Sequence, residues 1–183
     1  PSKPLGCYGD GGAVFTNNEE YASKIKLLRV HGQNKKYHHL YIGIGGRLDT
    51  LQAAILLAKL PNFKQELKDR QKVADKYTKE LSKTFQTPII KKNRTSAWAQ
   101  YTLRVKNRNN LQLKLKENRV PTSVFYPIPL HLQECFKYLN YKQNDFPVSD
   151  EASKEILSIP MNPFLTVEQI DFIIMIMKQN YNV

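Results

Sequence analysis

Apolar and polar positions alternate along this chain mostly with the period of an α-helix. The pattern predicts helices over 19–29, 48–60, 63–81, 110–119, 147–157 and 166–180. Asn17 and Thr166 each precede a Glu or Gln by three residues, which is the spacing of a capping pair at a helix start. Pro61 lacks a backbone N–H, so we expect it to kink or interrupt the helical stretch around it.

Shorter apolar stretches predict strands between these helices. They cover 13–16, 98–105 and 122–126. The alternation of strands and helices indicates a fold of the mixed α/β class. Residues 33–46 are rich in glycine and aromatic residues, and we expect them to be irregular. Two joined helices of the length seen around Pro61 often link one domain to another.

Charge narrows the possible partners. The chain has 183 residues, with 28 Lys and Arg against 16 Asp and Glu, and a formal charge of +12. Such a charge attracts nucleic acids, phosphorylated metabolites and anionic membranes. The lysines are spread along helical stretches, and the tight cluster of Lys91, Lys92 and Arg94 comes without a nucleic-acid-binding motif. We therefore expect no nucleic-acid partner; a basic nucleic-acid binder would show an affinity that falls steeply with salt.

The remaining composition limits where the protein works. The longest apolar run, Ile170–Met177, contains Asp171 and is far shorter than the roughly 20 residues that span a bilayer. We expect no membrane insertion. Cys7 and Cys135 are too few for a disulfide framework, which favours a reducing compartment such as the cytoplasm. The chain opens at Pro1 within a motif, and we expect it to be part of a longer protein.

Three segments could carry chemistry. Lys3 lies between Ser2 and a glycine-rich turn; a lysine amine can attack a reactive carbon, although a lone loop lysine is more often a solvated residue. Arg47 follows the glycines of 43–46 at a helix start, where it could bind phosphate, but an ordinary capped loop looks the same. The aromatics and prolines of 124–131 could line a ligand site, and a packed domain corner is the favoured alternative. The histidines and cysteines lack zinc-ligand spacing, so no metal is expected.

Taken together and in this order, these segments resemble the DegT/DnrJ/StrS family of pyridoxal-phosphate-dependent nucleotide-sugar aminotransferases. The resemblance rests on residues 1–14, Arg29–Gly32, Gly46–Ile55 and Tyr126–His131, and it extends over essentially the whole chain. It implies an α/β, fold-type-I aminotransferase of which this chain is the C-terminal portion. Residues 1–62 would then end the large cofactor domain, and 63–183 would form the linking helix and the small C-terminal domain.

The resemblance also implies roles for individual residues. Lys3 matches the family lysine that binds pyridoxal 5'-phosphate covalently and then moves a proton during transamination, and Ser2 lies beside it at the cofactor. Arg47 matches an arginine that meets the nucleotide-sugar in the neighbouring subunit. Tyr126, and less closely Phe125, match a loop that closes over the sugar. The family usually works as a homodimer with active sites shared between subunits.

Two positions depart from the family pattern. Gly45 replaces an Asn that commonly contacts the cofactor phosphate, so this position can bind the cofactor through its backbone alone. Phe125 replaces a His that often precedes the tyrosine of the sugar loop. We expect the first departure to weaken phosphate anchoring and the second to alter the choice of sugar.

The implied reaction is transamination of a UDP- or dTDP-linked keto-sugar with glutamate as the amino donor, for surface polysaccharide or glycan synthesis. The family's other cofactor-binding groups precede its lysine, so we expect this chain alone to bind the cofactor poorly and to be inactive. Much of 1–60 should then expose apolar surface. The alternative is a catalytically incomplete fragment that acts at most as a folded dimerisation or interaction module.

Overall fold

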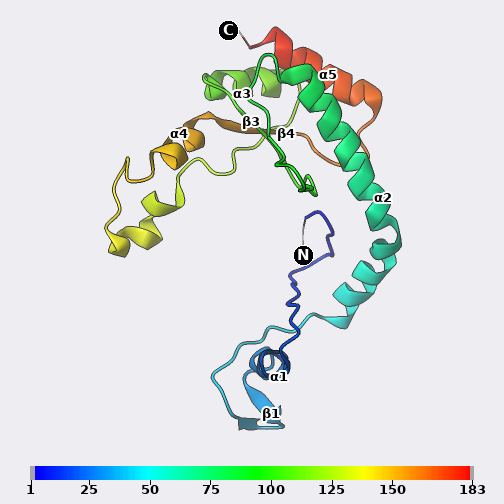
Figure 1. The fold of residues 1–183 in the computed structure, drawn as a ribbon, viewed down its shortest axis with the longest axis vertical. Coiled ribbons are helices and arrows are strands. Elements are labelled where there is room, and N and C mark those ends of the chain that lie inside the picture. The colour runs from blue at the N-terminus through cyan, green and yellow to red at the C-terminus, as the bar shows by residue number, and fades with distance from the viewer. Residues whose placement is uncertain (1–2, 182–183) are drawn as a thin grey trace. The chain divides into compact units, whose positions relative to one another are not determined.

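The computed structural model describes residues 3–181 and divides the chain into two compact units, Pro1–Lys64 and Gln65–Val183. The boundary falls inside the long helix α2, Thr50–Leu81 (Figure 1). Pro61 lies within this helix and does not interrupt it, contrary to the expectation of two separate helices. A proline removes one hydrogen bond from the helical ladder, and the bonds on either side of it carry the helix onward.

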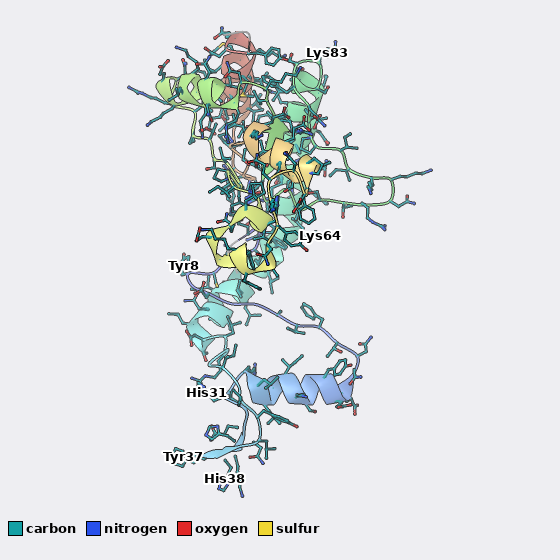
Figure 2. All side chains as sticks on the ribbon, turned by 90° about the vertical axis from the view of Figure 1, so that its left-hand side faces the viewer. Tyr8, His31, Tyr37, His38, Lys64 and Lys83 are labelled. Carbon is teal, nitrogen blue, oxygen red and sulfur yellow. The ribbon has the colours of Figure 1, made fainter. Side chains whose placement is uncertain are left out.

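The first unit contains α1, Glu19–Leu28, and a short antiparallel hairpin of β1, Gln33–Lys35, and β2, His38–His39. Figure 2 shows Tyr37 and His38 at the end of this hairpin. The helix starts at Asn18, whose side chain accepts the N–H of Tyr21, so Asn17 was the wrong cap.

The described part of the first unit forms no hydrophobic core. Among its described residues, 3–64, no hydrophobic side chain is buried, and the predicted strand over 13–16 does not form. An open hollow of about 610 Å³ lies between residues 12–17, α1 and residues 46–48, so these segments do not close on one another. The expectation that this region exposes apolar surface is confirmed. Its large exposed side chains include Val14, Phe15, Tyr37, Ile42, Ile44, Leu51 and Leu57.

The second unit is built around two antiparallel strands. β3, Tyr101–Arg104, pairs with β4, Ile156–Ile159, in a register that places Leu103 opposite Leu157. The sequence pattern had assigned the start of β4 to the end of a helix. That helix, α4, covers Pro147–Glu155, and the apolar stretch after it becomes a strand because β3 supplies its hydrogen-bond partners.

Helices cover this strand pair and complete the core. α3, Arg108–Glu117, contacts both β4 and α5, Val167–Gln179, and α4 contacts β3 (Figure 1). The predicted capping pair at the start of α5 is confirmed, with Thr166 and Gln169 exchanging hydrogen bonds. The core side chains are Val73, Ala74, Tyr77, Leu81, Phe85, Trp98, Tyr101, Leu103, Val105, Leu111, Leu115, Val120, Leu157, Ile159, Ile170, Ile173, Ile174, Ile176 and Met177.

The link from α3 to α4 passes through two short 3₁₀ helices, η1, Leu130–Leu132, and η2, Glu134–Leu139. The stretch predicted as a strand over 122–126 contributes a single bridge, in which Ser123 pairs with Ser158 of β4. Its two backbone hydrogen bonds measure 3.0 and 2.8 Å. This bridge fixes where the following loop leaves the core.

Candidate active-site residues

Lys3 lies in the exposed opening segment of the first unit, and this segment is attached to α2. The carbonyl of Gly6 accepts a hydrogen bond from Lys59 Nζ at 2.6 Å, and the N–H of Tyr8 donates to Gln52 Oε1 at 2.7 Å. These bonds join the backbone just after Lys3 to one helix, so the lysine has a defined anchor. The predicted cofactor residue Ser2 lies outside the described residues.

The glycine-rich segment before Arg47 folds against the end of α1. The N–H of His31 donates to the carbonyl of Ile44 at 3.0 Å, and the N–H of Gly46 donates to the carbonyl of Arg29 at 2.8 Å. Gly32 has a φ of +69°, and a Cβ there would lie 1.8 Å from the carbonyl oxygen of Tyr41. A side chain cannot occupy that space, which explains the glycine physically.

Gly45 and Arg47 can make different contacts with a ligand. A Cβ on Gly45 would lie 3.2 Å from Cε1 of His31, so the imidazole already occupies the side-chain space of this glycine. Gly45 therefore presents only backbone, as the sequence indicated. Arg47 is exposed immediately before α2, and its guanidinium is available for an anionic group.

Phe125 and Tyr126 belong to the second unit, on the loop that follows the Ser123 bridge. Their rings meet edge to face, with centroids 5.9 Å apart. Tyr126 is 70% exposed, which leaves its phenol open to a ligand. Lys3, Gly45 and Arg47 thus lie in one unit, and the two aromatic residues lie in the other.

Sequence reasoning missed a buried polar pair close to this loop. His131 in η1 and Asp150 in the first turn of α4 approach each other, with Nε2 and Oδ1 3.3 Å apart. Nineteen residues separate them, and neither helical nor strand periodicity relates positions so distant. The usable signal was local: a histidine directly after a proline-fixed turn, and an acidic residue in a helix's first turn, where the helix dipole favours it.

Two tyrosines with displaced pKa values are structural. Burial raises the pKa of Tyr77 and, to a smaller extent, that of Tyr101 above the usual value. The hydroxyl of Tyr77 donates to the carbonyl of Pro160 at 3.0 Å, and that of Tyr101 lies 2.7 Å from Thr78 Oγ1. Both phenols remain protonated at neutral pH and hold the core of the second unit together.

The candidate residues of the first unit offer the chemical groups that an aldehyde cofactor bearing a phosphate would need. Lys3 supplies an exposed amine, and the segment before α2 supplies backbone N–H groups and a guanidinium. No charged side chain is buried in the described part of the first unit. The described part of the first unit therefore offers no buried counter-charge for a cofactor bound near Lys3. Within residues 3–181, no helix is long and apolar enough to cross a membrane, and no cluster of potential metal ligands occurs.

The fold is that of the C-terminal portion of a fold-type-I aminotransferase. Residues 1–178 match the model of the DegT/DnrJ/EryC1/StrS aminotransferase family, and the chain belongs to this family. Both the resemblance found in the sequence and the α/β fold class are thereby confirmed.

The curated relatives include several sugar aminotransferases. The chain is 49% identical to the UDP-2-acetamido-2-deoxy-3-oxo-D-glucuronate aminotransferase of Pseudomonas aeruginosa, with 94% of this chain and 48% of that protein covered. It is 35% identical to the dTDP-3-amino-3,6-dideoxy-alpha-D-galactopyranose transaminase of Aneurinibacillus thermoaerophilus, over 90% of this chain and 45% of that one. The chain spans about half the length of the curated relatives it matches.

Solved structures of aminotransferases superpose on this chain. A DegT DnrJ EryC1 StrS aminotransferase from Brucella abortus superposes with a TM-score of 0.92 at 38% identity, covering 100% of this chain and 49% of that one. DesV from S. venezuelae, solved in complex with a ketimine intermediate, superposes with a TM-score of 0.92 at 29% identity, covering 96% and 48%. The chain therefore has the fold of about half of a protein of this family.

Proposed function

We propose that this chain is the C-terminal portion of an enzyme that transfers an amino group from glutamate to a UDP- or dTDP-linked keto-sugar. The observation that carries the proposal is the 49% identity over 94% of the chain to an aminotransferase of a UDP-linked oxo-sugar. A similarity to a dTDP-sugar transaminase supports the wider substrate class. The product is an amino sugar for surface polysaccharide or glycan, and the enzyme works in the cytoplasm.

Lys3 is the residue to which we assign the chemistry. Bound pyridoxal phosphate supplies an electron sink for the amino-group transfer. Lys3 Nζ would hold the cofactor at its aldehyde carbon and would carry the proton that moves during the transfer. The hydrogen bonds of Gly6 and Tyr8 to α2 support this role, because they restrict the backbone next to the amine.

Arg47, Phe125 and Tyr126 are assigned to the nucleotide-sugar. The guanidinium of Arg47 suits a diphosphate, because its N–H groups can pair with two oxygens at once. The exposed phenol of Tyr126 offers a hydrogen bond to a sugar hydroxyl, with Phe125 packed at its edge. We propose that these residues act in the active site of the neighbouring subunit of a homodimer. Gly45 contacts the cofactor phosphate through backbone only.

The test uses the full-length protein that contains this chain. Borohydride reduction in the presence of pyridoxal phosphate, followed by peptide mapping, should label Lys3. Lys3→Ala should lose the label and lower the transamination rate on the order of 10²–10⁴-fold or more, because one group performs both the binding and the proton transfer. Label on another lysine, or none, would contradict the assignment.

Substrate class is tested separately. Glutamate should aminate UDP-2-acetamido-2-deoxy-3-oxo-D-glucuronate or a dTDP-linked keto-sugar, with product detected by mass spectrometry. Arg47→Ala should raise the KM for the nucleotide-sugar while the reaction of glutamate with the bound cofactor remains unchanged. Arg47→Lys is the matched control, since it keeps the charge without the paired N–H geometry. Equal loss in both half-reactions would remove Arg47 from the acceptor site.

A second candidate function is favoured by the exposed apolar surface of the first unit. Under this alternative the 183-residue chain is a catalytically incomplete module that associates through that surface. Light scattering of the isolated chain should then show a defined dimer, and added pyridoxal phosphate should bind weakly and without turnover. A monomeric chain, or tight cofactor binding by the isolated chain, would eliminate the alternative.

A further inference from the structure

The loop that carries Phe125 and Tyr126 is held at both ends by one continuous segment of the second unit. At its start, Ser123 exchanges two backbone hydrogen bonds with Ser158 of β4. At its end, His131 lies against Asp150 of α4. Since α4 ends at Glu155 and β4 begins at the next residue, both attachments are made to the same α4–β4 segment. Movement of the loop as a whole therefore requires one attachment to break.

The second attachment is a buried contact between a titratable pair. The side chains of His131 and Asp150 are 8% and 4% exposed, and Nε2 and Oδ1 are 3.3 Å apart. Neither atom has a hydrogen-bond partner among the described residues, so their mutual approach is an ion-pair contact and not a hydrogen bond. A buried carboxylate oxygen and a buried ring nitrogen without other partners are costly, and this contact is the compensation that the described residues offer.

The surroundings orient both groups. The other carboxylate oxygen of Asp150, Oδ2, accepts the N–H of Asn144 at 2.6 Å, which fixes the rotation of the carboxylate. The ring of His131 packs on that of Phe146, with centroids 4.8 Å apart. The carboxylate thus joins η1, the turn at Asn144 and the start of α4 at one point.

Packing alone does not hold this part of the molecule closely. An open apolar hollow of about 320 Å³ lies beside the pair. Its lining residues are Leu130, His131, Phe136, Leu139, Tyr141, Phe146 and Ser149. Side chains around such a hollow lack neighbours on one side and lose the corresponding dispersion contacts. The polar contact therefore contributes more to the position of η1 than it would in a filled core.

We propose that the His131–Asp150 pair is a clasp that positions Tyr126 for the acceptor sugar, with His131 and Asp150 as positioning residues that do not themselves touch the substrate. The proposal rests on the proposed function, in which Tyr126 contacts the nucleotide-linked keto-sugar. The clasp sets the downstream end of the loop, and the Ser123 bridge sets its upstream end. Loss of the clasp leaves the loop attached at one end only.

The experiment compares His131→Ala, His131→Gln and Asp150→Asn in the full-length protein that contains this chain. Hydrogen–deuterium exchange of peptides covering 121–133 reports the loop, and kinetics of the two half-reactions report function. His131→Ala should speed exchange in the loop and lower kcat/KM for the keto-sugar by about 10- to 100-fold, the scale of loss when a binding group is misplaced by about an ångström. The reaction with the amino donor should remain unchanged.

The conservative variants and a matched control separate positioning from general destabilisation. His131→Gln keeps an N–H donor that reaches Asp150 and should recover most of the acceptor kcat/KM, whereas Asp150→Asn should behave as His131→Ala does. Glu134→Gln removes an ion pair with Lys137 in the same region, but both of those side chains are largely exposed, so wild-type values are expected.

Two results would overturn the clasp. A folded His131→Ala protein with wild-type exchange over 121–133 would show that the pair does not hold the loop. Equal loss in both half-reactions, without recovery in His131→Gln, would show a structural role only. If the wild-type protein has no transaminase activity, the proposed function fails and positioning for the sugar fails with it, while the exchange data still decide whether the pair restrains the loop.

Discussion

Helices form in both units of this chain, but the described parts of the two units differ in how far they bury hydrophobic side chains. In the second unit, 65–183, helices and strands enclose all the buried hydrophobic side chains found in the described residues. In the first unit, α1 has a good N-cap at Asn18 and buries none of its residues. Local hydrogen bonds can therefore specify a helix without a core beneath it. The N-cap does not by itself keep that helix stable in water, because short isolated helices are only marginally stable.

The proposed site residues are divided between the two units. The proposed cofactor lysine and Arg47 lie in the unit without a core, whereas the proposed sugar-loop residues lie in the unit with one. The first unit's exposed apolar side chains, such as Phe15 and Ile42, need cover that its own residues do not provide. We expect Lys3 to hold a fixed position only when that apolar surface is covered. The Tyr126 loop, in contrast, is held by contacts within the second unit.

The largest expected effect is the separation of the two units. A chain of residues 65–183 should unfold cooperatively, with dispersed amide signals in NMR spectra, since it retains the complete core. Residues 1–64 alone should show no cooperative transition, because their described part buries no hydrophobic side chain. A sharp thermal transition of 1–64 as a monomer would abolish the distinction between the units.

A core truncation should give the next largest effect. Leu103 in β3 is fully buried, so Leu103→Ala should lower the free energy of unfolding of the 183-residue chain by about 2–5 kcal/mol in urea titrations. Phe15→Ala removes a larger side chain that is 92% exposed, and we expect no measurable loss. Similar losses for the two variants would mean that Phe15 is packed in solution.

Equivalent helix caps in the two units provide a finer comparison. Thr166→Ala breaks the capping pair of α5, whose inner face is in the core, and should cost about 1 kcal/mol in the free energy of unfolding. Asn18→Ala removes the side-chain cap of α1 and should reduce helical circular dichroism slightly while leaving that free energy unchanged. Coupling of the Asn18 cap to the unfolding of the second unit would contradict this independence.

The smallest effect concerns pH. The hydrogen bond from Lys178 Nζ to Glu80 Oε2, 2.8 Å long, lowers the pKa of Glu80 and links α5 to α2. A lowered pKa in the folded state adds stability above the unfolded pKa, and this contribution disappears as pH falls through the folded pKa. Glu80→Gln should therefore destabilise the chain slightly at pH 7 and have no effect in acid. A difference that grows on acidification would show that the ion pair is not responsible.

Some features of the fold could be predicted because their causes are local. The helix over Glu19–Leu28 and the capping pair at Thr166 depend on residues within four positions of each other. The family could likewise be identified from short motifs around Lys3, Arg47 and Tyr126. The assignment of these three residues to cofactor and sugar follows from that resemblance and stays a prediction.

Other features depend on partners far away in the chain. Residues 13–16 have the composition of a strand and find no neighbour among the described residues, whereas Ile156–Ile159 looked like the end of a helix and pairs with β3. Hydrogen bonds of a strand come from another segment, so its own pattern does not decide its state.

By itself, the sequence determined the class of the protein, its main helices and their caps, because each follows from side chains a few positions apart. Tertiary structure alone decided which apolar faces are buried, where β4 forms, and that His131 meets Asp150. Those outcomes depend on segments brought together by the core of the second unit. The contacts that stabilise these features form only when the chain has folded around that core.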